Sequence, residues 1–137
     1  MKHRLYFVIT IFVLGFAIAA FAQGPNRTRN YDPKTEVTVK GTVEDVQQNV
    51  GRRGGTGTHL ILKTDSGTLP VHVGPSAYIA KKQFSFSKGD QIEVLGSKVL
   101  IAGKETILAR EITKEGKTLV LRNAQGIPEW SGANRPK

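Results

Sequence analysis

The most informative absence in this sequence is cysteine. None of the 137 residues is Cys, so the chain has neither a disulfide framework nor a lipoprotein anchor on a cysteine. A domain without disulfides must be held together by its own hydrophobic core, and a chain of this length can bury one.

Long hydrophobic runs are also rare, because only residues 5–22 form one. That run follows the basic start MKHR and ends in Ala20-Phe21-Ala22 before Gln23. A basic start, an apolar stretch and a small-x-small site are the three parts of a secretory signal peptide. We therefore predict a signal peptide at residues 1–22, a periplasmic or secreted protein, and no membrane span after cleavage. The alternative is an uncleaved anchor, since about 18 apolar residues can span a bilayer.

Acidic side chains are in the minority. The formal charge is +9, and without Lys2 and Arg4 the chain retains 18 basic and 11 acidic residues, or about +7. This excess favours an anionic ligand, nucleic acid among them, or an acidic protein of the cell envelope. Solubility alone also explains it. The oligomeric state does not follow from the sequence.

Alternating apolar and polar residues begin after a polar segment. Residues 23–35 contain Pro, Asn and Arg without apolar periodicity, which predicts a disordered leader. Residues 36–123 then form the predicted domain, and residues 124–137 form a Gly- and Pro-rich tail with the only Trp, Trp130. We expect Trp130 to fold back and cover one end of the domain.

Several strands are predicted by this alternation. In the first, Val37, Val39 and Val43 share one face, and Gly41 on the same face indicates a bend or bulge. Residues 58–64 and 69–73 flank the turn signal DSG and form a hairpin. With Ser66-Gly67 as the two-residue turn, Leu60 would face Val73.

A short helix interrupts the strands. Helical spacing within residues 74–84 predicts about two turns, and alternation then resumes from residue 91 to the end of the domain. Three strands, a short helix, two strands and an extra C-terminal strand are the element order of an all-β, five-stranded Greek-key OB-fold barrel with one added strand.

Four segments also resemble a known family: VTVKGTVEDV, GTHLILKTDSGTLPVHVGPSAYI, FSKGDQIEVLGSKV and LVLRNAQGIPEW. They are similar to a family of small exported bacterial OB-fold proteins that includes the domain of magnetosome MamS/MamX-type proteins. The resemblance implies fold and export but little about activity. Some magnetosome members carry a haem-attachment Cys-x-x-Cys-His, which this chain cannot have because it lacks cysteine.

The loop sequence GRRGGTG separates the first two predicted strands. It leads into a strand and lacks the Gly-Lys-Ser/Thr ending of a phosphate-binding P-loop, so that interpretation fails. In an OB-fold the same loop contacts ligands. We therefore select Arg52 and Arg53, together with Lys63 on the second strand, as candidate ligand-binding residues. The alternative is a flexible hairpin tip whose arginines serve only solubility.

Two histidines form the other candidate site. In the predicted hairpin His59 and His72 share the face opposite Leu60 and are diagonal neighbours, close enough to bind one metal ion or a non-covalent haem iron. No third ligand is evident, although Glu44, Asp65 and Glu93 are possibilities. The alternative is a pair of ordinary histidines bonded to nearby backbone.

No catalytic motif appears, because the chain has neither a nucleophile elbow nor paired carboxylates. Tyr78, Phe84, Phe86 and Trp130 all lie outside strands two and three, where a single-strand nucleic-acid binder would present stacking platforms. We therefore predict an exported, non-catalytic OB-fold binding module of the bacterial cell envelope without a required cofactor. The alternatives are a single-stranded nucleic-acid binder acting through Arg52 and Arg53, and a metal- or haem-handling protein.

Overall fold

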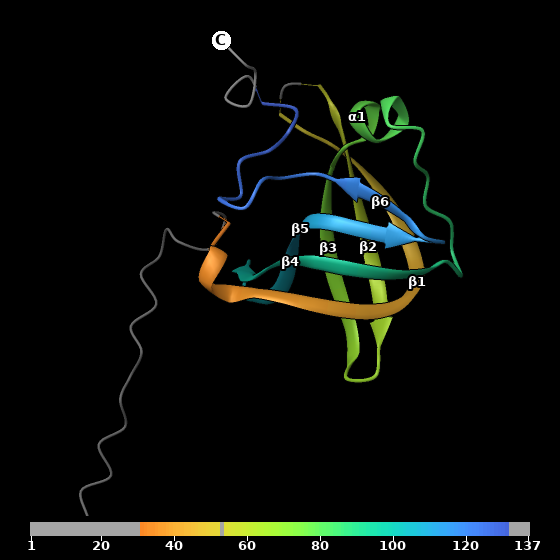
Figure 1. The fold of residues 1–137 in the computed structure, drawn as a ribbon, viewed down its shortest axis with the longest axis vertical. Coiled ribbons are helices and arrows are strands. Elements are labelled where there is room, and N and C mark those ends of the chain that lie inside the picture. Colours follow the sequence, from red (N-terminus) through yellow and green to blue (C-terminus); the bar gives the residue numbers. More distant parts are fainter. Residues whose placement is uncertain (1–30, 53, 132–137) are drawn as a thin grey trace, which may run out of the picture.

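A computed structural model describes residues 31–52 and 54–131 of the chain. Within them lie six strands, one α-helix and a 3₁₀ turn (Figure 1). In chain order these are η1 (Pro33–Thr35), β1 (Glu36–Val50), β2 (Thr56–Thr64), β3 (Gly67–Pro75), α1 (Ser76–Lys81), β4 (Gln91–Ile101), β5 (Lys104–Lys114) and β6 (Lys117–Val120). The predicted signal peptide, most of the leader, Arg53 and the end of the tail lie outside the described residues.

The strands close into a barrel. Their order is β3-β2-β1-β4-β5-β6, and a parallel pairing of β3 with β5 joins the two sides. That seam is short, with only Val71 opposite Ile107 and His72 opposite Leu108. In Figure 1, β2 and β3 run across β4, β5 and β6, and α1 lies at one end of the barrel. A closed five-stranded barrel with a helix between its third and fourth strands confirms the predicted OB-fold, and β6 is the predicted extra strand.

The inward faces of the strands form one hydrophobic core. Its fully buried members include Leu60, Leu62, Val71, Val94 and Ile107. The alternation of β1 is as predicted, since Val43 is buried and Val37 and Val39 pack against the same core. Burial of this apolar surface is the main stabilising term in the absence of disulfides.

The β2–β3 hairpin has a different register from the predicted one. Leu60 lies opposite Val71 rather than Val73, and Thr64 lies opposite Gly67, so the two-residue turn is Asp65-Ser66 and not Ser66-Gly67. The Thr64 hydroxyl fixes this turn by accepting from the Ser66 amide at 3.2 Å and donating to the Gly67 carbonyl at 2.9 Å. The error is two residues, which leaves every side chain on its predicted face.

Gly41 is not the site of the bulge in β1. The register irregularity falls between Val43 and Asp45. A Cβ on Gly41 would instead lie against the Lys63 carbonyl oxygen and the Leu62 side chain. The glycine therefore permits the close crossing where β1 leaves β4 and begins to pair with β2.

Both ends of the described chain pack onto the barrel. Residues 31–35, which the sequence analysis assigned to the leader, are ordered here: the Tyr31 hydroxyl donates to Glu36, and Arg110 Nη1 donates to both Glu36 carboxylate oxygens at 3.0 and 3.2 Å. At the other end Trp130 packs against the core, and its ring lies 5.4 Å from that of Tyr78. The expected return of Trp130 is confirmed.

Among residues 31–52 and 54–131, no helix has the length and hydropathy needed to cross a bilayer. These residues also carry much less charge than the whole chain. All 11 acidic residues lie among them but only 13 of the 20 basic ones, which gives a net charge of +2. The excess positive charge therefore resides mainly in the sequence before residue 31 and after residue 131.

Candidate functional site

The β1–β2 loop is a compact turn. Val50 and Thr56 still pair across it, the Gly51 amide donates to the Gly55 carbonyl at 2.7 Å, and the Gly54 amide donates to Gly51 at 3.0 Å. Gly54 has a φ of +81°, a conformation that glycine adopts without strain. The loop therefore holds exposed Arg52 at a defined position, whereas Arg53 lies outside the described residues.

A groove of about 810 Å³ lies beside this loop. Its walls come from the loop, from the start of β2 and from the β3–α1 junction, and they include Val50, Arg52, His59, Pro75 and Ala77. Val50 is 76% exposed, so it adds apolar surface to the groove. The structure thus brings Arg52 and His59 to one hollow that combines a cation, an imidazole and apolar surface.

A small hydroxyl network joins β1, β2 and α1 next to the groove. The buried Thr58 hydroxyl lies 2.9 Å from that of Ser76, and both contact the side-chain carbonyl of Gln48. This network holds the first residue of α1 against the two strands that carry the loop. The sequence analysis missed the contribution of Pro75 and Ser76 to the groove because only the folded barrel brings them to the β1–β2 loop.

His59 and His72 lie closer together than predicted. They are directly opposite one another rather than diagonal, and their ring centroids are 4.1 Å apart with an interplanar angle of 43°. The predicted shared face is confirmed. His59 lines the groove, whereas His72 belongs to the β3–β5 seam, where it lies opposite Leu108.

Both imidazoles are neutral near pH 7. Burial lowers the pKa of His59. Burial also lowers the pKa of His72, to about 4, and the positive charges of His59 and Arg122 act in the same direction. A neutral imidazole has an unprotonated ring nitrogen, which is the form that binds a metal ion.

No complete metal site accompanies this pair. Among the residues that the structure describes, no group of three His, Cys, Asp or Glu side chains is placed to hold an ion. Two imidazoles alone leave most coordination positions to water or to a second molecule. Covalent haem does not fit at all, because the chain contains no cysteine.

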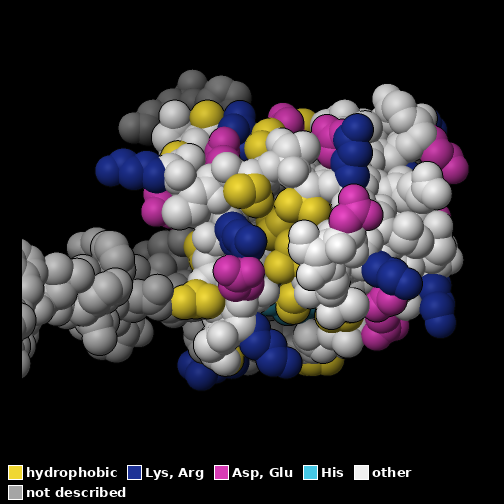
Figure 2. All heavy atoms as spheres, turned by 90° about the horizontal axis from the view of Figure 1, so that it is seen from below, with side chains coloured by type: hydrophobic (Ala, Val, Ile, Leu, Met, Phe, Trp, Pro, Cys, Tyr) yellow, Lys and Arg dark blue, Asp and Glu magenta, His cyan; other side chains and the backbone are white. Residues whose placement is uncertain are grey.

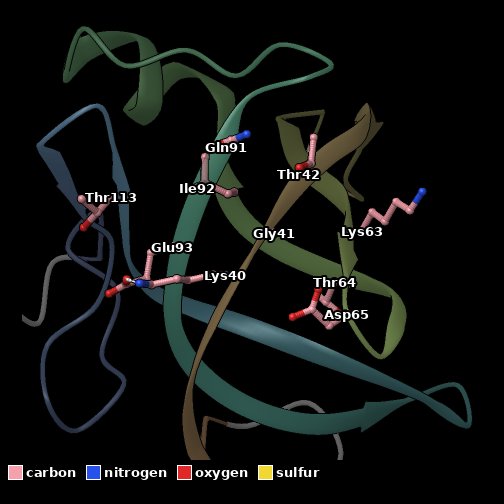
Figure 3. Close-up of a pocket in the computed structure, with 10 residues that line it drawn as sticks. All are labelled: Lys40, Gly41, Thr42, Lys63, Thr64, Asp65, Gln91, Ile92, Glu93 and Thr113. Atoms are coloured by element: carbon pink, nitrogen blue, oxygen red, sulfur yellow. Dashed lines mark ion pairs between the residues drawn. The ribbon is translucent and has the colours of Figure 1, made fainter.

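Lys63 belongs to a different part of the surface. It lies four residues beyond His59 on β2, about 13 Å along the strand. There it lines a separate hollow of about 440 Å³ around Gly41 (Figure 3). In that view the Lys63 side chain points away from the ion pair between Lys40 and Glu93, whose charged atoms are 3.6 Å apart. The structure therefore does not join Lys63 to Arg52.

The described aromatic side chains serve mainly in packing. Phe84 and Phe86 pack against the core, with Lys114 Nζ at 5.5 and 5.9 Å from their ring centroids, and Tyr78 contacts Trp130. None of these four rings belongs to β2 or β3. Figure 2 shows one face on which Lys and Arg are interspersed with Asp and Glu and form no continuous basic patch. The placement of these rings outside β2 and β3 does not favour a stacking platform for single-stranded nucleic acid on those strands.

Arg122 was missed by the sequence analysis. It follows β6, and its Nη1 donates to the carbonyls of Ala109 on β5 and, at 3.5 Å, Val73 on β3. Its guanidinium carbon lies 5.1 Å from the ring centroid of Trp130. The residue thus joins the two strands of the short seam. A basic residue two positions after the last strand, eight residues before the only Trp of the sequence, was the available signal.

Comparison with known proteins identifies the family. The model of the MamS/MamX magnetosome protein family matches residues 35–119, and the chain belongs to that family. No curated protein sequence matches it. Among solved structures, the chain is similar to the N-terminal domain of the PriB protein from Thermoanaerobacter tencongensis, described as dimeric, with 18% identity and a TM-score of 0.48 over 59% of this chain and 96% of that one.

Proposed function

We propose that this member of the MamS/MamX family is an exported, non-catalytic binding module of the bacterial cell envelope. Its ligand occupies the groove beside the β1–β2 loop. The observation that carries the proposal is the groove itself, in which Arg52 and His59 border about 810 Å³ of hollow surface. Pockets of this size with a few polar groups on apolar walls are typical ligand sites, and this loop is a usual contact region of OB-folds.

The residues of the groove support binding rather than catalysis. They include one guanidinium and one neutral imidazole, and no described residue that lines the groove is a carboxylate. A positive side chain without a carboxylate beside it favours an anionic ligand or an acidic segment of a partner protein. Export is supported by the N-terminal sequence, and N-terminal sequencing of the secreted protein tests it, with Gln23 as the expected first residue.

Binding can be tested with two labelled anions, a heparin oligosaccharide and a single-stranded oligothymidylate. Fluorescence anisotropy should show that Arg52→Ala weakens binding by about tenfold, the loss expected for one charge-assisted contact. Lys117→Ala, which removes the same charge from the exposed first residue of β6, is the matched control and should have little effect. Equal losses in both variants would mean that the groove does not bind the anion.

The oligonucleotide separates this proposal from nucleic-acid binding. A nucleic-acid binder would prefer oligothymidylate to the oligosaccharide, and its affinity would fall steeply with salt. We expect no such preference, because β2 and β3 present no aromatic platform and the described residues carry a net charge of only +2.

A second candidate function is metal or haem handling, favoured by the direct pairing of two neutral imidazoles. Calorimetric titration with Cu²⁺, Zn²⁺ or haem would then saturate near one equivalent, and either His59→Gln or His72→Gln would abolish it. Binding that persists in the double variant would place the ion elsewhere and remove this candidate.

A further inference from the structure

A second hollow lies next to the histidine pair, at the barrel seam. It has a volume of about 560 Å³ and lies beside the β4–β5 turn, the other loop through which OB-folds contact ligands. Four separate parts of the chain form its walls: the N-terminal segment, β3, the β4–β5 hairpin and the segment after β6. Its main lining residues are Tyr31, His72, Ile101, Leu108, Arg122 and Pro128.

Arg122 gives this pocket a positive charge. Burial lowers the pKa of its guanidinium, which nevertheless remains a cation at neutral pH. The hydrogen-bond acceptors of Arg122 are two backbone carbonyls, and its stacking partner is Trp130. Among the residues that the structure describes, no carboxylate lies within ion-pair distance of it.

Two other partly buried cations of the barrel each pair with a carboxylate. Arg110 pairs with Glu36 at 3.0 Å, and Lys114 pairs with Asp90 at 3.2 Å. Withdrawing a cation from water without a counter-charge costs free energy, which neutral carbonyls offset only in part. An anion from solution would give Arg122 the counter-charge that the Glu36 carboxylate gives Arg110.

The other walls indicate what kind of anion fits. Ile101, Leu108 and Pro128 are apolar, and Leu108 is 6% exposed. His72 is neutral at pH 7 and offers a hydrogen bond without adding positive charge. One cation among apolar walls matches a ligand with a single negative charge and an apolar body, because a second charge would be desolvated without compensation.

We propose that this pocket is a binding site for a small organic carboxylate, whose carboxylate group pairs with the Arg122 guanidinium. The planar guanidinium matches a carboxylate in a bidentate arrangement. The apolar body of the ligand occupies the space between Ile101, Leu108 and Pro128. The site goes beyond the proposed function, because this pocket is separate from the groove beside the β1–β2 loop.

Trp130 provides a reporter for the test, because it is the only Trp and stacks on Arg122. The full-length exported protein is titrated with cyclohexanecarboxylate and with the neutral cyclohexanecarboxamide at constant ionic strength. The carboxylate should cause a saturable change in tryptophan fluorescence, and the amide should not. Equal responses to both compounds, or no response to the carboxylate, would overturn the proposal. So would equal competition by inorganic phosphate.

Two variants locate the site. Arg122→Met removes the charge and should weaken carboxylate binding by at least about tenfold, but it also removes the hydrogen bonds to β3 and β5. Ile101→Phe therefore serves as the second variant, since it fills the pocket and leaves Arg122 in place. It should weaken binding to a similar extent, and unchanged affinity in a folded Ile101→Phe protein would contradict the proposal. Lys117→Ala is the control.

The two proposals fail separately. If the carboxylate does not bind while the anionic oligosaccharide still depends on Arg52, only the pocket at the seam is refuted. If the carboxylate binds through Arg122 while Arg52→Ala has no effect on the oligosaccharide, only the groove beside the β1–β2 loop is refuted.

Discussion

Protonation of the histidine pair should destabilise the fold. His59 and His72 are the two histidines after the predicted signal peptide, since the third is His3. The folded protein holds both rings neutral, with the pKa of His72 lowered to about 4 by burial and by the charges of His59 and Arg122. In the unfolded chain each ring titrates near pH 6.5. The unfolded state therefore binds more protons below that pH.

The sign and size of the effect follow from proton linkage. The histidine contribution to the free energy of unfolding is present above pH 6.5 and is lost as the pH falls from 6.5 towards 4. If the folded state kept the His72 ring unprotonated down to pH 4, the free energy of unfolding would fall by up to about 3 kcal/mol between pH 6.5 and pH 4. Because part of the His72 ring remains in contact with solvent, we expect about 1 kcal/mol of destabilisation at pH 5.

Thermal unfolding measured at several pH values between 7.5 and 5 checks this prediction. For a domain of this size, 1 kcal/mol corresponds to a fall in Tm of about 4–8 °C. The His59→Gln/His72→Gln double variant should lose this dependence. The pKa values of Glu36 and Asp90 are lowered, so these carboxylates affect stability only at more acidic pH. A wild-type Tm that is constant over this range, or an equal fall in the double variant, would refute the reasoning.

Two further predictions concern the fold. Gly96→Ala should lower the free energy of unfolding by more than about 2 kcal/mol, because the added Cβ would collide with the Leu108 carbonyl oxygen. Gly55→Ala is the control and should be nearly neutral, because open space surrounds Gly55. Chemical denaturation measures both free energies. Lys114→Met should cost about 1–2 kcal/mol and accelerate amide exchange in residues 85–90, because the ammonium group ties that segment to β5 through Ser85 and Asp90; unchanged exchange would contradict this role.

Much of the fold could be predicted because alternation is a local signal. Leu60, Leu62 and Val71 are buried and His59 and His72 face outward, as the period of two required. The hairpin register was not determined by the same signal. A shift of two residues keeps each side chain on its face, and both Asp65-Ser66 and Ser66-Gly67 can form a tight turn. Hydrogen bonds of the Thr64 side chain favour the observed turn, and alternation does not report them.

The candidate sites depend on contacts between residues far apart in the sequence. Arg122 reaches Val73 and Ala109 from beyond the last strand, and Tyr31 packs against Gly126 from the opposite end of the domain. Neither position shows periodicity that would mark it. The net charge of the whole chain says little about the charge of the barrel surface, because most of the excess positive charge lies outside residues 31–131.

The histidine pair shows how one irregularity of the sheet links fold and site. From Thr64 to His59 the β2–β3 pairing is regular, but Thr58 pairs with Gly74, so Val73 is an extra residue on β3. If the pairing of Thr58 continued without this bulge, outward-facing His59 would lie opposite buried Val73. Because the bulge takes up one residue of β3, His59 lies opposite His72. Beyond the bulge β3 continues to its junction with α1, which forms part of the groove. A bulge beside a functional site redirects side chains in this way. Here it places His59 at the groove beside the β1–β2 loop and His72 at the pocket at the barrel seam.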